Sequence, residues 1–541
     1  MIPAVRMAAP VVLCFGLVGR LVAQESHAHH GETLGRVVFP VSCAPEARTG
    51  FERAMALLHS FWWEEGGRAF RAVAAADSSC AMAYWGLALN FWGNPFVGGP
   101  SGDNLRQGAT AASRALALGA PTAREQGFLA AVGALYRDYE ATPNPHRLLA
   151  YSDTLARVSR DFPADPEVAI YYALSLVATA SPMDTTFTRQ RQAAAILNPL
   201  FRRFPEHPGL AHYIIHANDS PQLAALGLDA ARRYAQIAPS APHAQHMPSH
   251  IFVRLGLWDE TIAANQRSLD AGIEYARAQG LRGVAPEQFH ALDYMVYGYL
   301  QEGRDSAARR TVAQGLALTG VLSSDALVMN YNRVAMEARV PLEAGDWAAA
   351  ARLPVRAAGQ GGIGEALAHF ARGIGAARSR DTSQARVEVA ALGAIRVALA
   401  GQPGYNWSRI VGIEQQTVVA WSLIAVGDTV GALREAKAAA DLEDVTEKHP
   451  VTPGELLPAR ELEGDLLFTV GRYAAARAAY QATLRREPGR PRSLFGAARA
   501  ADLAGDVAAA RTGYRAYLSR MQQSDGARGE LEIARGALAG R

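Results

Sequence analysis

The chain has 541 residues, of which 49% are hydrophobic and 19% are charged. This length exceeds what one hydrophobic core usually supports, and the composition excludes wholesale disorder. The formal charge of +3 is too balanced over this length for an electrostatic nucleic-acid binder.

The first 23 residues have the pattern of a secretory signal peptide. Arg6 gives a short positive start, residues 7–18 are apolar, and small or aliphatic residues end at Ala23. This run is too short to span a bilayer, and no later run reaches the roughly 18 apolar residues that a membrane span needs. We therefore expect an exported protein, periplasmic or secreted, with no membrane span.

Residues 24–50 are predicted to be a flexible segment whose three histidines follow the expected cleavage site. Cleavage would leave Cys43 and Cys80, an even number of cysteines in an oxidising compartment. We predict a disulfide between them, with two separate buried thiols as the alternative.

From residue 51 onward the sequence reads as amphipathic helices separated by short turns that contain Gly or Pro. A turn glycine, followed five residues later by a small residue, recurs along the chain. Its copies are Gly256 and Thr261, Gly303 and Ala308, Gly345 and Ala350, Gly427 and Ala432, Gly471 and Ala476, and Gly505 and Ala510. The last two copies are 34 residues apart. The glycine closes a tight turn between antiparallel helices, and the small residue lets the second helix lie close to the first.

A 34-residue helix-turn-helix unit with these small positions resembles the tetratricopeptide repeat (TPR) family. The segments AMAYWGLAL (residues 81–89) and HMPSHIF (residues 246–252) are similar to segments of exported bacterial TPR proteins of unclear role. The resemblance implies an all-α fold, an α-solenoid of stacked antiparallel helical hairpins in a TPR-like superhelix. It also implies a concave groove lined by the first helix of each hairpin.

We expect two TPR-like arrays, residues 51–320 with a histidine cluster and residues 321–541. The loops at residues 93–104 and 401–408 are longer than the repeat allows. They could be binding lids, interruptions of the stack or plain insertions.

Seven of the 14 histidines lie between residues 207 and 290. His212 and His216 form an H-x3-H pair, and His246 and His250 form another, 34 residues further along. Each pair therefore occupies the same two places on the first helix of neighbouring hairpins. Residues four apart on a helix are neighbours, and packed helices lie roughly 8–10 Å apart, so the four imidazoles are expected to converge.

His243 projects from the same helical face as His246, three residues later. His290 and Asp293 precede the turn glycine Gly303 by the same number of residues as His243 and His246 precede Gly256. They therefore hold the same places in the next repeat. The resemblance to TPR proteins makes these the groove-facing places.

Neutral imidazole suits zinc, copper, nickel or iron, so the pattern predicts a transition-metal site. Its predicted ligands are His212, His216, His243, His246, His250, His290 and Asp293. Asp219 and Tyr297 are predicted to surround them as outer partners. Two alternatives remain: a metal-free groove that recognises anionic or aromatic groups of a peptide, and histidines that only pack helices together.

The first interpretation is an exported helical-repeat scaffold that binds a peptide or protein partner in its concave groove and holds a histidine-rich metal site. The alternative is a metal-dependent enzyme, hydrolytic or oxidative, that uses the same histidines. No catalytic residue is assigned, because no general base beyond the expected ligands is identifiable. The sequence favours the scaffold without deciding whether the protein is an enzyme.

Overall fold

The computed structural model describes residues 32–181, 184–319, 326–356, 362–402 and 404–540. The predicted signal peptide and the three histidines after it lie outside these ranges. Thr33–Arg541 form one compact unit. Within the described ranges the regular elements are α-helices, and none of them is long and apolar enough to cross a membrane.

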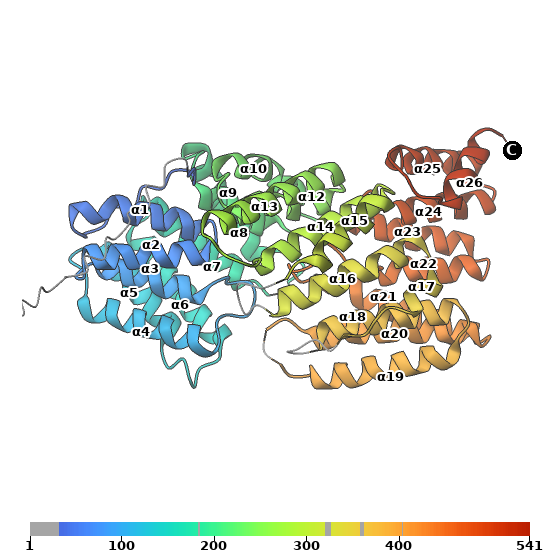
Figure 1. Ribbon diagram of the computed structural model, residues 1–541, viewed down its shortest axis with the longest axis horizontal. Helices are drawn as coiled ribbons and strands as arrows, with labels where there is room; N and C mark the ends of the chain where they lie inside the picture. The colour runs from blue at the N-terminus through green and yellow to red at the C-terminus, as the bar shows by residue number, and fades with distance from the viewer. Residues whose placement is uncertain (1–31, 182–183, 320–325, 357–361, 403, 541) are drawn as a thin grey trace, which may run out of the picture. The chain divides into compact units, whose positions relative to one another are not determined.

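The helices follow one another along the chain with short connections (Figure 1). The first group is α1 (Pro45–His59), α2 (Trp63–Ala76), α3 (Ala81–Trp92), α4 (Gly102–Leu118), α5 (Ala123–Tyr136), α6 (Asn144–Asp161), α7 (Pro166–Ala178), α8 (Thr188–Arg203) and α9 (Pro208–Asn218). The second group is α10 (Ala224–Ile237), α11 (Pro242–His246), α12 (Pro248–Leu255), α13 (Trp258–Ala278), α14 (Pro286–Gln301), α15 (Asp305–Ala317), α16 (Ala326–Ala344) and α17 (Trp347–Ala351). The third group is α18 (Ile363–Arg378), α19 (Thr382–Ala398), α20 (Trp407–Ala425), α21 (Thr429–Asp444), α22 (Ala459–Thr469), α23 (Tyr473–Arg486), α24 (Pro491–Leu503), α25 (Val507–Arg520) and α26 (Gly529–Leu538).

Consecutive helices pack against each other as antiparallel hairpins, and each hairpin packs on the next. Helix α18 contacts α19, which contacts α20, and the same relation holds for α23, α24 and α25. The fold is therefore an α-solenoid of stacked helical hairpins, which confirms the predicted fold class.

The repeated glycines act as the sequence predicts. Gly303 and Gly471 have φ angles of 67° and 76°, in the left-handed region that favours glycine. The small residues that follow them, Ala308 and Ala476, are completely buried between helices. A turn glycine and a small packing residue thus define each of these hairpins.

The segment before α1 also belongs to the folded unit. Phe39 is buried and its ring contacts those of Phe51 and Phe128. Cys43 and Cys80 form the predicted disulfide, with their Cα atoms 4.8 Å apart. The bond joins the segment before α1 to the residue that precedes α3.

Buried polar contacts connect parts of the chain on either side of the predicted array boundary at residue 320. The Arg339 guanidinium forms an ion pair with Asp293 at 2.7 Å, and the hydroxyl of Tyr297 donates to Glu487 at 2.9 Å. The position of the boundary stays a prediction, because residues 320–325 lie outside the described ranges.

Candidate metal centre

Four helices carry the six clustered histidines. Pro208 stands at the start of α9, where a missing N–H costs nothing, and this helix carries His212 and His216. His243 and His246 lie on α11, His250 lies on α12, and His290 lies on α14.

The second H-x3-H pair crosses the break between α11 and α12. Pro248 has no backbone N–H, so the helical hydrogen-bond ladder is interrupted there. Met247 nevertheless keeps helical angles, with φ of −52° and ψ of −35°. The four-residue spacing therefore still brings His246 and His250 to the same side.

We call His212, His216 and His243 the first triad. The Nε2 atom of His212 lies 3.1 Å from Nε2 of His216 and 3.3 Å from Nε2 of His243. Each residue offers one nitrogen, and the three nitrogens lie within 4.8 Å of one another. The triad joins α9 to α11.

We call His246, His250 and His290 the second triad. Here the Nε2 atoms of His246 and His250 are 3.0 Å apart, and the ring of His290 lies 4.4 Å from that of His246 between centroids. This triad also has three nitrogens within 4.8 Å of one another. It joins α11 and α12 to α14.

The two triads are neighbours. Ring centroids of His243 and His246 are 6.2 Å apart, and those of His216 and His250 are 6.4 Å apart. The six imidazoles therefore form one continuous group.

Hydrogen bonds at the opposite ring nitrogen decide where the protons lie. His246 Nδ1 donates to the side-chain oxygen of Asn265 at 2.6 Å, and His250 Nδ1 donates to the carboxylate of Asp219 at 2.9 Å. The amide nitrogen of Asn265 donates to the carbonyl of Thr261, which fixes the orientation of the amide. In a neutral imidazole with a protonated Nδ1, Nε2 carries a lone pair. The lone pairs of His246 and His250 therefore face each other.

In the first triad, one histidine donates a hydrogen bond from Nδ1 in the same way. His212 Nδ1 donates to the backbone carbonyl of His59 at 2.7 Å, so its Nε2 also carries a lone pair. Outer partners of this kind orient metal-bound histidines and raise their basicity.

Burial keeps these rings neutral. It lowers the pKa of all six imidazoles, and the neighbouring histidines lower most of them further. Burial brings the pKa of His246 to about 3. At neutral pH the triads therefore present unprotonated nitrogens, the form that binds a metal ion.

Two of the other predicted residues have different partners. Asp293 joins neither triad, because its two carboxylate oxygens accept hydrogen bonds from the Arg339 guanidinium. The hydroxyl of Tyr297 donates to Glu487 and accepts from Arg490 at 3.3 Å. Asp219 does contact the second triad, through His250, and its other oxygen accepts from Arg254 at 2.9 Å.

A third histidine group lies behind the first triad, and its chemistry differs. The carboxylate of Glu167 lies 3.1 Å from His59 Nε2 and 2.8 Å from His207 Nε2. The hydroxyl of Tyr213 bonds to His59 Nδ1 at 3.0 Å. Because each of these bonds pairs a donor with an acceptor, this group is a satisfied buried network that holds the His59 carbonyl against His212.

The sequence spacing does not show that aromatic residues cover the first triad. Phe96, from the loop at residues 93–104, stacks on His216 with 4.1 Å between centroids, and Phe61 contacts His212 at 4.4 Å. A Cβ atom placed on Gly98 in this loop would lie 3.8 Å from the Cα atom of Gly404, in the loop at residues 401–408. The two loops that exceed the repeat length therefore approach each other closely, and one of them covers the site.

Lys448 is another residue that the spacing does not reveal, although it is one of only two lysines in the chain. Its ammonium donates to the carbonyl of Thr452 at 2.8 Å. Burial lowers its pKa to about 8, and the nearby Asp219 carboxylate opposes this shift. Its charge also acts on His246, His250 and His290, whose pKa values it lowers.

No known family model matches the chain, and no curated protein matches it. Solved structures with a distant likeness include yeast Tom70, with 11% identity over 92% of this chain and 96% of that one and a TM-score of 0.32. The TPR domain of P58(IPK) shares 14% identity over 70% of this chain and 99% of that one, with a TM-score of 0.21. The human IFIT1 dimer with PPP-AAAA shares 10% identity over 78% of this chain and 87% of that one, with a TM-score of 0.35. These values are too low to transfer a function.

Proposed function

We propose that this helical-repeat protein binds transition-metal ions at the two adjacent histidine triads. The chemistry of the donor set fits zinc, copper, nickel or iron, which accept neutral imidazole nitrogens. His212, His216 and His243 would hold one ion, and the residues of the second triad would hold the other. Asp293 is not part of the proposed ligand set, because Arg339 occupies its carboxylate.

One observation carries the proposal: His246 and His250 direct two lone pairs at each other across 3.0 Å. Lone pairs at this distance repel, and a cation bound to both nitrogens converts the repulsion into attraction. Two nitrogens at 2.0–2.1 Å from a tetrahedral zinc ion lie about 3.3 Å from each other. The Nε2 separations of 3.0, 3.1 and 3.3 Å in the triads are close to this value.

The test is metal analysis of the full chain, prepared from its native compartment without a metal-affinity tag. The wild type should retain about two ions per chain. The double variant His212→Ala, His250→Ala removes one ligand from each triad and should lose most of the metal. As a matched control, His146→Ala with His369→Ala removes two histidines outside the triads and should retain the wild-type content.

Two outcomes contradict the metal site. Equal metal content in both double variants would show that the ions bind elsewhere. The second outcome is a wild type that holds no metal and a double variant, His212→Ala with His250→Ala, that loses its helical circular dichroism. This would show that the histidines only pack helices.

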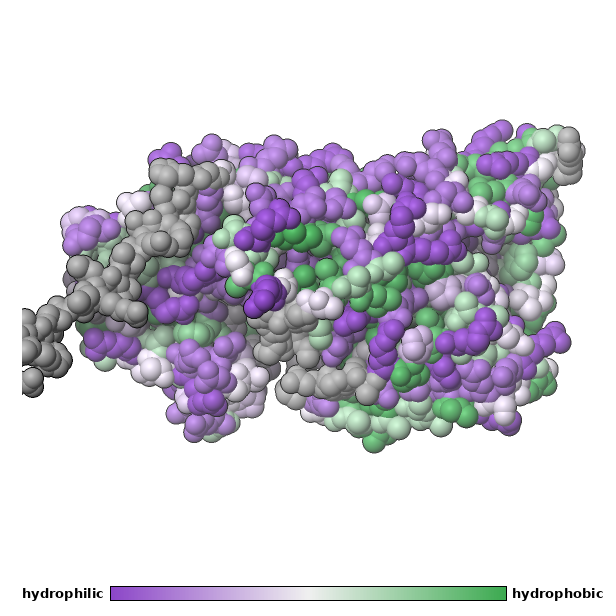
Figure 2. All heavy atoms as spheres, viewed as in Figure 1, coloured by the Kyte–Doolittle hydropathy of each residue, from purple (hydrophilic) through white to green (hydrophobic). Residues whose placement is uncertain are grey.

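Binding of a protein partner is the second candidate function. Helix α19 exposes Val387 and Val397 by 64% and 68% of their surface. Apolar residues gather along the lower edge of the face in Figure 2, where Figure 1 draws α19. A contiguous apolar surface of this kind favours association with another protein. The predicted concave groove remains a candidate surface for binding the partner within this proposal.

Export is also part of the proposal. It is supported by the apolar run before Ala23 and by the Cys43–Cys80 disulfide, a bond typical of oxidising compartments. Cell fractionation with N-terminal sequencing checks it, and a cytosolic protein with an intact Met1 would contradict it.

A further inference from the structure

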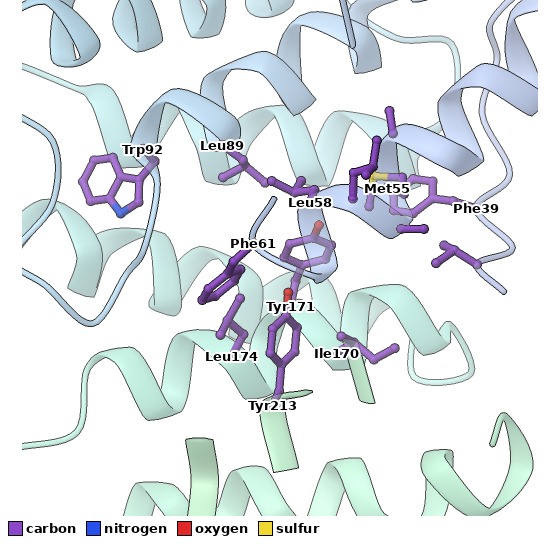
Figure 3. Close-up of a cluster of buried hydrophobic side chains, with 14 of the residues drawn as sticks. Phe39, Met55, Leu58, Phe61, Leu89, Trp92, Ile170, Tyr171, Leu174 and Tyr213 are labelled. Carbon is purple, nitrogen blue, oxygen red and sulfur yellow. The ribbon is translucent and has the colours of Figure 1, made fainter. Parts of the chain in front are cut away.

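An apolar cavity of about 40 Å³ lies beside the first triad. Residues of α1, α2, α3, α5, α6, α7 and α9 line it, together with the turn between α1 and α2 and the first residues of the loop at 93–104. Figure 3 labels these lining side chains: Leu58, Phe61, Leu89, Trp92, Tyr171, Leu174 and Tyr213. Most of the lining is aliphatic or aromatic.

Phe61 and Tyr213 form the wall between the cavity and the histidines. Both line the cavity, and their rings lie 4.4 and 5.2 Å from that of His212 between centroids. Phe61 also stacks on His243 at 5.5 Å. Its φ of 53° is in the left-handed region, which costs a residue with a side chain conformational energy. A strained aromatic residue at this point suits a functional boundary better than ordinary packing.

The size and polarity of the cavity restrict what it takes. A cavity that holds benzene has a volume of about 150 Å³, so a space of about 40 Å³ admits only a few heavy atoms. Tyr171 is 2% exposed, and its hydroxyl has no hydrogen-bond partner among the described residues. A lining with so little polar surface disfavours ions and leaves one donor for a weak acceptor.

We propose that this cavity takes dioxygen, a small uncharged molecule, and supplies it to a redox-active metal ion in the first triad. The inference rests on the proposed metal site. It names dioxygen as the reactant in the oxidative alternative. Imidazole-bound copper(I) or iron(II) gives an electron to dioxygen, whereas zinc has no redox chemistry. Phe61 and Tyr213 would be the side chains that dioxygen passes.

Xenon tests the cavity without any metal, because this apolar atom binds dry cavities. Crystals of the full chain under xenon pressure should show one xenon atom among Leu174, Tyr171 and Phe61. Ala178→Leu adds three carbon atoms to the lining and should exclude xenon. Ala169→Leu adds the same atoms on the same helix away from the lining and should not. Ordered water and no xenon in the wild type would overturn the proposal.

The supply of dioxygen is tested by the oxidation of copper(I)-loaded protein, followed by stopped-flow absorbance. Each copper(I) loses one electron, and dioxygen leaves as superoxide. Ala178→Leu should slow this reaction at least threefold, and Ala169→Leu should match the wild type. Equal rates in both variants would overturn the supply of dioxygen.

The metal in the native protein separates this inference from the proposed metal site. Native protein that holds only zinc would overturn the supply of dioxygen, while the proposed metal site would stand. Xenon binding in a protein that retains no metal would instead contradict the proposed function.

Discussion

His246 and His59 are both buried histidines, yet their ring nitrogens have opposite kinds of neighbours. His59 pairs one nitrogen with the Glu167 carboxylate and the other with the Tyr213 hydroxyl, so it needs no further ligand. His246 donates from Nδ1 and faces another lone pair at Nε2. At the scale of single residues, the proton position on Nδ1 therefore separates a structural histidine from a candidate metal ligand.

Replacing Asn265 by Ala removes the acceptor that holds the Nδ1 proton of His246. The ring can then adopt the other tautomer, and we expect metal affinity to fall about 10–100-fold. Isothermal titration with zinc or copper measures the change. Asn218→Ala is the matched control, because this buried asparagine also donates to a carbonyl four residues earlier but bonds to no histidine among the described residues. An equal loss of affinity in both variants would contradict the role of Asn265.

Glu414 offers a test of pH dependence away from the triads. Burial, reinforced by Glu455, raises its pKa to about 8, and its Oε2 has no hydrogen-bond partner among the described residues. The folded-state pKa is above the unfolded value, so this group's contribution to stability is complete below about pH 4.5 and is lost as the pH rises to about 8.

Glu414→Gln keeps a neutral side chain at every pH. The variant should therefore match the wild type near pH 4.5 and be more stable by on the order of a few kcal/mol at pH 8. Urea unfolding at the two pH values measures this. Glu435→Gln is the control with the opposite sign, because hydrogen bonds from Gln416 and Arg434 lower the pKa of Glu435. A constant difference between wild type and Glu414→Gln across this pH range would refute the buried acid.

At the scale of helices, one helix break and one long loop decide how the site is built. The break at Pro248 does not misalign the second H-x3-H pair, because Met247 keeps helical angles. The loop at residues 93–104 brings Phe96 onto His216. The disulfide acts on the same region, since it ties the segment before α1 to the start of α3.

Replacing Cys43 and Cys80 together by Ser should lower the free energy of unfolding by about 2–4 kcal/mol, because the open chain gains entropy when unfolded. Urea denaturation of oxidised wild type and double variant gives the difference. The wild type with added reductant should approach the variant. A midpoint that is unchanged in both cases would mean that the bond adds no stability.

At the scale of the whole molecule, the stack of hairpins is not a simple row in which each unit contacts only its neighbours. Asp293 and Arg339 are completely buried as a pair, and Arg254 forms ion pairs with both Asp219 and Glu447. The segment at residues 447–455 contributes backbone carbonyls to Tyr294 and Arg339. These contacts bind distant parts of the chain into one unit.

Fragments 33–319 and 326–541, expressed separately, should each be much less stable than the full chain. Separation removes the Arg339 partner of Asp293 and the Glu487 partner of Tyr297, so each fragment loses buried polar contacts that the full chain has. Size-exclusion chromatography of the mixed fragments should show a one-to-one complex with restored helical content. If fragment 33–319 alone unfolds at the same urea concentration as the full chain, the contacts across the two parts are energetically unimportant.

The helical hairpins follow from the sequence itself, because they depend on local rules. A glycine at the turn, such as Gly303, and an alanine five residues later act within one hairpin, and four-residue spacing alone brings His212 beside His216. The repeat register also predicted that the two histidine pairs would be neighbours. Asp219, singled out for its place near His216, does contact His250.

Only the tertiary structure decided which partners complete the site. Asn265, the His59 carbonyl and Phe96 reach the histidines from segments whose sequence spacing carries no information about contact. The same reason explains why Asp293 is not a ligand. Its place in the repeat matches a ligand position, but its carboxylate pairs with Arg339, which is 46 residues further along the chain. A charged group takes the strongest partner within reach when it is buried, and that partner is determined by packing rather than by register.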